Sequence, residues 1–198
     1  LLGHDVIHMD ETPVQVLKEP GRAASSKSQM WVQRGGPPGK PVILFEYDPS
    51  RAQAVPLRLL EGWKGQLMAD GLESYGAIAF TEGVTRLGCW VHARRRFVDA
   101  GKVLPEGKRG RAHEALALIG KLYAIEKEAR ELSDAERLGR RQSQSRAVID
   151  ELRRWLDQVL PTVPPTSVLG GALGYLHRQW PRLIRYLARG DLPIDNNP

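Results

Sequence analysis

The chain has 198 residues, of which 41% are hydrophobic and 26% are charged, a composition typical of a globular protein large enough to bury a core. It lacks an apolar run of about 18 residues, which excludes a membrane-spanning helix. Its N-terminus lacks the basic and apolar segments of a secretory signal. The single cysteine, Cys89, excludes an internal disulfide and fits a reducing cytoplasm.

The net charge of +6 is unevenly distributed. Residues 1–88 hold 9 Lys and Arg against 10 Asp and Glu, whereas residues 89–198 hold 20 against 13, and most of the 20 are Arg. Guanidinium groups bind phosphate through a planar fork and keep their charge at any working pH. The basic half therefore favours a nucleic-acid partner, although a helical region with solvated charged faces has the same composition.

The first half of the chain predicts short strands joined by polar loops and two helices. Strands are expected over 4–18, 29–34, 41–47, 65–70 and 84–91, and helices over 51–62 and 74–79. The first three strands follow one another through short loops, which is typical of an antiparallel meander. The order of three strands, helix, strand, helix and strand predicts a mixed sheet in an α/β domain.

The second half predicts helices. Apolar residues recur with a period of 3.6 over 111–132, 146–160 and 168–189, after a polar linker over 101–110. Pro181 is expected to kink or split the last helix, and Gly190 to end it.

Two aspartates end apolar runs in two of the predicted strands. Asp10 follows the run Asp5-Val6-Ile7-His8-Met9, and Asp70 follows Gly65-Gln66-Leu67-Met68-Ala69. If these strands are neighbours, the carboxylates converge, and oxygen ligands brought together in this way suit Mg²⁺ or Mn²⁺ in phosphoryl transfer on nucleic acid. The alternative is that each Asp only ends a strand and opens a turn.

A two-metal site needs a further carboxylate, and a late one is available. Asp195 lies in Ile194-Asp195-Asn196-Asn197, where a loop enters a further helix, so it is a candidate for a third acid. Its alternative role is that of a helix-capping or turn residue.

The segment Cys89-Trp90-Val91-His92-Ala93-Arg94-Arg95-Arg96 is the second group of residues that carry chemistry. Cys89 and His92 have the spacing of half a zinc site, but the chain has no other Cys and no paired His, so a structural zinc is not expected. Arg94, Arg95 and Arg96 are better explained as phosphate contacts, with Arg140 and Arg141 as further candidates. A solvated helix start is the alternative for the three adjacent arginines.

Taken in order, these motifs resemble the transposase of insertion sequence family sixty-six, over essentially the whole chain. The resemblance is carried by Asp10-Glu11-Thr12-Pro13, Tyr47-Asp48-Pro49-Ser50-Arg51, Gly65-Gln66-Leu67-Met68-Ala69-Asp70-Gly71 with Tyr75, Gly88-Cys89-Trp90-Val91-His92-Ala93-Arg94-Arg95-Arg96-Phe97, and Ile194-Asp195-Asn196-Asn197.

This resemblance implies a ribonuclease H-like (retroviral-integrase-like) core with a largely helical insertion and C-terminal part. We expect the catalytic core over 1–92, the insertion over 93–166 and a C-terminal helical segment over 167–198. The resemblance also implies Asp-Asp-Glu chemistry, with two Mg²⁺ or Mn²⁺ ions at Asp10 and Asp70. The Glu of that pattern would fall after Pro198, so the chain is expected to be a truncated catalytic domain that is inactive alone. Cys89, His92, Asp195, Asn196 and Asn197 then take structural or positioning roles.

The resulting prediction is a bacterial, metal-dependent polynucleotidyl transferase that cleaves DNA strands and transfers them during transposition. Its partners would be transposon ends and target DNA, with a homo-oligomer assembled on DNA in the cytoplasm at the nucleoid, and without a membrane. Two alternatives stay open at this point. One is a ribonuclease H-like nuclease that only cleaves, and the other is a DNA-binding or assembly module with vestigial acids.

Overall fold

The computed structural model describes residues 1–37, 39–71 and 73–196 and divides the chain into two compact units. The sheet unit is Leu1–Leu87 and the helical unit is Gly88–Asn197. Within the described residues, none of the helices combines the length and the apolar character needed to span a bilayer.

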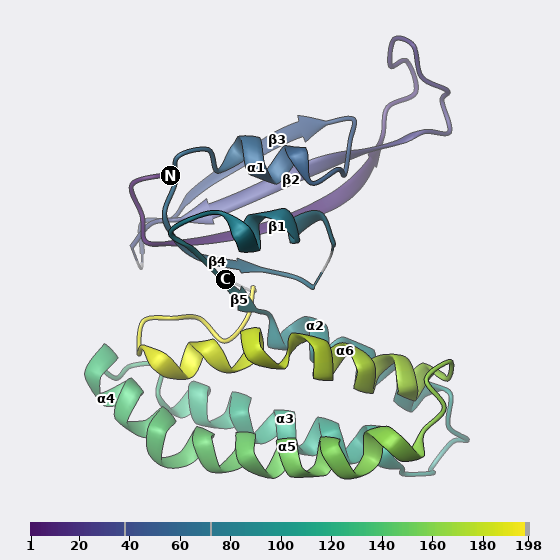
Figure 1. Cartoon of the computed structure of the whole chain (residues 1–198), viewed down its shortest axis with the longest axis vertical. Helices are drawn as coiled ribbons and strands as arrows, with labels where there is room; N and C mark the ends of the chain where they lie inside the picture. Colours follow the sequence, from purple (N-terminus) through teal and green to yellow (C-terminus); the bar gives the residue numbers. More distant parts are fainter. Residues whose placement is uncertain (38, 72, 197–198) are drawn as a thin grey trace. The chain divides into compact units, whose positions relative to one another are not determined.

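The sheet unit contains five strands in the order β3-β2-β1-β4-β5 (Figure 1). Their bounds are β1 (Val6–Gln15), β2 (Lys27–Gly35), β3 (Val42–Asp48), β4 (Gly65–Ala69) and β5 (Val84–Gly88). Strands β1, β2 and β3 pair antiparallel, and β4 pairs parallel with β1 on the other side. The predicted antiparallel meander and mixed sheet are therefore confirmed, and β1, which contains Asp10, is the neighbour of β4, which Asp70 follows.

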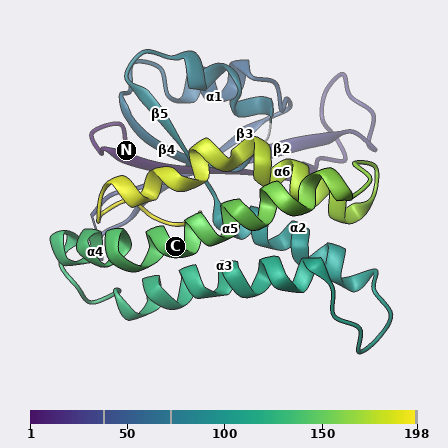
Figure 2. The same ribbon diagram turned by 60° about the horizontal axis from the view of Figure 1, so that its bottom comes forward.

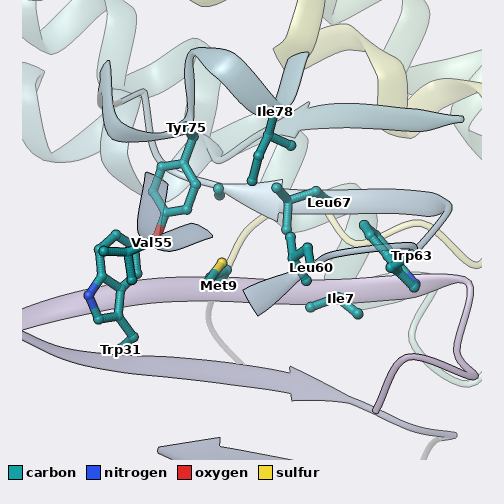
Figure 3. Close-up of a cluster of buried hydrophobic side chains, with 10 residues drawn as sticks. Ile7, Met9, Trp31, Val55, Leu60, Trp63, Leu67, Tyr75 and Ile78 are labelled. Atoms are coloured by element: carbon teal, nitrogen blue, oxygen red, sulfur yellow. The ribbon is translucent and has the colours of Figure 1, made fainter. Parts of the chain in front are cut away.

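One face of this sheet carries the core of the unit. Alternate residues of β1 point to it, because Ile7 and Met9 are buried whereas their neighbours are partly exposed. They pack against Trp31 and Leu67 from the adjacent strands (Figure 3). Helix α1 (Ala54–Leu59) and the 3₁₀ helices η1 (Glu73–Tyr75) and η2 (Ala77–Phe80) cover this face, and the cluster includes Val55, Leu60, Trp63, Tyr75 and Ile78.

The helical unit is built from α2 (Trp90–Lys102), α3 (Arg111–Glu128), α4 (Asp134–Arg140), α5 (Arg146–Val159) and α6 (Val168–Leu183). Helix α2 packs against α3 and α6, and α3 runs beside α5 (Figures 1 and 2). Two edge-on aromatic pairs join the helices of this unit: buried Trp90 with Trp180, and buried Phe97 with the partly exposed Trp155. This geometry suits the quadrupoles of the rings.

Two predictions of local structure were wrong in detail. The strand expected over 84–91 ends at Gly88, because helix α2 begins at Trp90. The helix expected over 74–79 is two short 3₁₀ turns. Helix α6 continues through Pro181 to Leu183 and is followed by the 3₁₀ helix η5 (Ile184–Ala188). In addition, α4 and α5 are joined by the π turn η3 (Arg141–Ser145), which the apolar pattern does not reveal.

Candidate active site

Asp10 and Asp70 occupy equivalent positions on two parallel strands. The register pairs Val6 with Gln66 and His8 with Met68, so two residues further along Asp10 is level with Asp70. Each follows a buried residue of the core face by one position, and both carboxylates are partly exposed. Asp10 lies inside β1 and Asp70 directly follows β4, so the parallel pairing makes the two residues neighbours across the sheet, and their role as metal ligands stays a prediction.

A third carboxylate, Glu11, lies beside this pair on the core face. Its side chain is fully buried, and its Oε2 accepts a 2.7 Å hydrogen bond from the hydroxyl of Tyr75. The guanidinium of Arg51 donates to Oε1 from Nε at 2.8 Å and from a terminal nitrogen at 2.6 Å. Burial raises the pKa of Glu11, the bonds from Tyr75 and Arg51 act in the opposite direction, and the charge of Asp70 raises it.

Tyr75 also interacts electrostatically with the two aspartates. Burial raises the pKa of the Tyr75 phenol, and the negative charges of Glu11, Asp70 and Asp10 raise it further. All three carboxylates therefore lie within electrostatic reach of one buried hydroxyl. Asp10 itself is oriented by the backbone N–H of Glu11, which donates to its Oδ1 at 2.9 Å.

Arg86 of β5 holds the segment that joins Asp70 to Tyr75. It is almost completely buried, and it donates to the backbone carbonyl of Asp70 at 2.6 Å and to that of Tyr75 at 2.9 Å. Its guanidinium also lies 5.6 Å from the centre of the Tyr75 ring, a cation–π distance. The Arg86 side chain thus holds both ends of this segment through its hydrogen bonds to the carbonyls of Asp70 and Tyr75.

The residues present fit a hard divalent cation. Mg²⁺ is commonly held by one or two carboxylates, with water and substrate phosphates completing its shell, and Asp10 and Asp70 are such a pair. Glu11 is not a third candidate ligand, because Tyr75 and Arg51 donate hydrogen bonds to its two carboxylate oxygens. Across the described residues, no three His, Cys, Asp or Glu side chains gather closely enough to form a complete metal cage.

The motif around Cys89 forms a separate cluster in the helical unit. Cys89 precedes α2 and is buried, and its Sγ accepts a 3.3 Å hydrogen bond from the backbone N–H of Asn196. Burial raises the pKa of the Cys89 thiol to about 11, so the group is a neutral thiol at physiological pH. A β-carbon on Gly88 would lie 2.8 Å from the backbone nitrogen of Leu183, so the close approach of α6 requires glycine at that position.

Asp195 is tied into the same cluster. Its Oδ2 accepts a 2.7 Å bond from the Tyr123 hydroxyl of α3, and the N–H of Trp90 donates to the carbonyl of Ile194 at 3.2 Å. Burial raises the pKa of Tyr123, and its hydrogen bond to Asp195 raises it further. These contacts hold the segment around Asp195 against α3 and the start of α2, and the positioning role expected for Asp195 and Asn196 stays a prediction. Asn197 lies outside the described residues.

The five arginines predicted to bind DNA fall into two groups. Arg94, Arg95 and Arg96 are exposed on α2, and Arg96 stacks on the Tyr175 ring at 4.3 Å. Arg140 is partly exposed and pairs with Glu128 at 2.9 Å.

Arg141 differs from the other four because it is buried. It forms two bonds with Glu126 and three with the carbonyls of Tyr186, Arg189 and Leu192. These contacts occupy its donors inside the protein, so we do not retain a phosphate contact for Arg141.

Sequence reasoning assigned no role to several residues that organise these clusters, namely Glu11, Tyr75, Arg86 and Tyr123. A signal for two of them is visible in the sequence. Glu11 directly follows Asp10, and Arg86 is a charged residue inside a short strand that is otherwise suited to burial. Tyr123 is one of several apolar or aromatic residues on a helix, and nothing in its local pattern distinguishes it.

Comparison with known proteins identifies the family. The model of the IS66 transposase family matches residues 1–198. Two relatives are uncharacterized proteins of Sinorhizobium fredii (strain NBRC 101917 / NGR234). The protein y4jD is 29% identical, and the match covers 96% of this chain and 39% of y4jD. The protein y4qI is 27% identical, and the match covers 96% of this chain and 37% of y4qI. The chain thus spans less than two fifths of these relatives, and no solved structure matches it. The chain belongs to the IS66 family of transposases.

Proposed function

We propose that this chain is the catalytic region of a DDE-type transposase, which cleaves DNA strands and transfers them to target DNA in a metal-dependent reaction. The observation that carries the proposal is the register of β1 and β4, which makes Asp10, inside β1, level with Asp70, directly after β4. Membership of the IS66 family supports it. We assign the mixed sheet, with β1 between antiparallel β2 and parallel β4, to the ribonuclease H-like type.

The proposed roles follow from the contacts. Asp10 and Asp70 hold Mg²⁺ or Mn²⁺, which when bound supply Lewis acidity and an activated nucleophile for in-line displacement at phosphorus. The Glu11 N–H fixes the rotation of the Asp10 carboxylate. Arg86, through the Asp70 and Tyr75 carbonyls, holds the segment that carries Asp70 at the strand end.

DNA is the proposed partner, with a homo-oligomer assembled on it. Arg94, Arg95 and Arg96 are exposed on one helix and are proposed to contact phosphates. Arg140 is a weaker candidate, because binding DNA would require it to leave Glu128.

The test is a Mn²⁺ titration of the chain followed by thermal unfolding, with the variant Asp10→Asn. We expect Mn²⁺ to raise the unfolding temperature of the wild-type chain and to have little effect on Asp10→Asn, because ligand binding to the folded state stabilises it by mass action. Asp5→Asn is the matched control, since Asp5 is exposed and precedes β1.

Equal stabilisation of Asp10→Asn and the wild-type chain would reject the metal role. In a longer protein that includes the Glu of the pattern, Asp10→Asn should abolish Mn²⁺-dependent nicking, whereas Asp5→Asn should retain it. A duplex with a pre-cleaved end then separates strand transfer from cleavage alone.

A further inference from the structure

Helix α6 and the turn that follows it carry an unbalanced positive charge. From Gln158 to Gly190 the chain has four arginines and neither Asp nor Glu. Two of them, Arg178 and Arg182, lie on α6 itself, and Arg185 lies on η5. An acid-free helical stretch of this length is unusual in a chain with 23 acidic residues, because charged faces of surface helices commonly mix both signs.

Helical geometry places these arginines on one side of α6. Arg178 and Arg182 are four residues apart, which is about 6 Å along the helix axis and about 40° around it. Tyr175 lies within about 60° of both by the same reckoning. A β-carbon on Gly174 would lie 3.1 Å from a terminal nitrogen of Arg178, so the guanidinium folds back toward the turn that carries Tyr175.

Helix α2 adds a third cation to this side. Arg96 lies 4.3 Å from the centre of the Tyr175 ring, and α2 packs directly against α6. The Arg96 guanidinium therefore lies on the side of α6 that carries Arg178 and Arg182. We call Arg96, Arg178 and Arg182 the arginine flank.

The cations of the flank differ in their partners from others in the same unit. Arg140 pairs with Glu128, Lys121 with Glu151 and Arg153 with Asp157. Among the described residues, neither Arg178 nor Arg182 has a carboxylate within ion-pair distance, and Arg182 donates only to the side-chain amide of Gln179.

Neighbouring charge adds to the positive field of the flank. Burial lowers the pKa of Arg185, and the positive charge of Arg182 lowers it further. Like charges one turn apart destabilise a helix, so this positive field has a cost to folding.

We propose that the arginine flank binds the phosphate backbone of duplex DNA and is a DNA-contact surface of the proposed transposase. The choice of DNA as the partner rests on that proposed function. Guanidiniums one helical turn apart match the spacing of successive phosphates along a strand to within a few ångströms. Arg is suited to this contact because its planar fork binds phosphate oxygens in pairs and because it loses little hydration. The contact is with the backbone, so it is independent of base sequence.

The test measures binding of the chain to a short labelled duplex by fluorescence anisotropy, between about 50 and 200 mM salt. Each phosphate contact adds about 0.9 to the slope of log K against log salt, so R178A/R182A should reduce the slope by about 2 and weaken binding roughly 60-fold at 0.1 M salt. The loss should be the same for two duplexes of unrelated sequence.

Matched variants separate the surface from net charge. Arg154→Ala removes one positive charge from an exposed position on α5 and should leave the slope within a few tenths of the wild-type value. Arg178→Ala alone also removes one charge but should reduce the slope by about 0.9. R178K/R182K keeps the charge and should restore most of the slope while recovering only part of the affinity. Circular dichroism and thermal unfolding of each variant establish that it is folded.

Several outcomes would overturn the inference. They are absence of duplex binding by the wild-type chain, equal losses with Arg154→Ala, an unchanged slope in R178A/R182A, or tighter binding of a single strand of the same length. None of them bears on the Mn²⁺ titration of Asp10, so failure of the flank and failure of the proposed metal site are distinguishable.

Discussion

Replacing Tyr75 with Phe removes one oxygen atom from the core of the sheet unit and leaves its packing almost unchanged. The Tyr75 ring keeps its edge-on contact with Trp31 at 6.0 Å, and only the 2.7 Å hydrogen bond to Glu11 is lost. Hydrogen bonds to charged groups contribute about 1.5–3 kcal/mol, and the deprived oxygen is buried. Because Arg51 continues to bind the other oxygen, we expect a loss near the lower end, about 2 kcal/mol.

Urea denaturation followed by tryptophan fluorescence measures this loss, since Trp31 packs against the mutated ring. Tyr47→Phe is the matched control, because the Tyr47 hydroxyl binds Glu19 at an exposed site and its removal should have a much smaller effect. In a double-mutant cycle with Glu11→Gln, the coupling should be about 1–2 kcal/mol. If Tyr75→Phe costs no more than Tyr47→Phe, or if the cycle shows no coupling, the reasoning from the buried hydrogen bond is refuted.

Three further predictions concern the helical unit. Burial raises the pKa of Cys89 to about 11, so the native thiol keeps a proton that the unfolded chain loses above about pH 9. The free energy of unfolding should therefore fall between about pH 9 and 11. Urea titrations of Cys89→Ala should lack this pH-dependent fall. Arg141→Met should cost about 3–5 kcal/mol in unfolding experiments because it leaves a buried carboxylate and three carbonyls without their donor, whereas Arg140→Met should cost less than about 1 kcal/mol. Gly88→Ala should lower the unfolding temperature through a clash with the backbone of α6, whereas Gly171→Ala, with open space around it, should raise it slightly.

The sheet could be predicted from sequence because its signals are local. Apolar runs and turn residues mark the strands, and the aspartates that end two of these runs stand out as exceptions to the pattern. The resemblance to the transposase family then indicated that the two aspartates belong to one metal site. The boundary at Gly88 was missed because Cys89-Trp90-Val91 is equally suited to a strand and to the start of a helix. The close approach of Gly88 to Leu183 decides it, and that contact joins positions almost a hundred residues apart.

The fate of individual polar residues was less predictable, for a physical reason. Arg140 and Arg141 are adjacent in a polar helical stretch, yet one lies at the surface and the other is buried against three carbonyls. The π turn that begins at Arg141 shifts the helical register, and a pattern with a period of 3.6 cannot anticipate such a shift. Glu11 and Tyr75 are likewise 64 residues apart, so only the tertiary fold joins them.

The dense anchoring of the segment that follows α6 has a consequence for local opening. This stretch has little regular structure beyond η5, yet Arg141 binds three of its carbonyls, Tyr123 binds Asp195 and the Trp90 N–H binds Ile194. Amide exchange and proteolysis follow the free energy of local opening and not the secondary-structure type. The segment should therefore open only with the helical unit as a whole, and the exposed connection between β1 and β2 at residues 16–26 is where a protease would cut the native chain first.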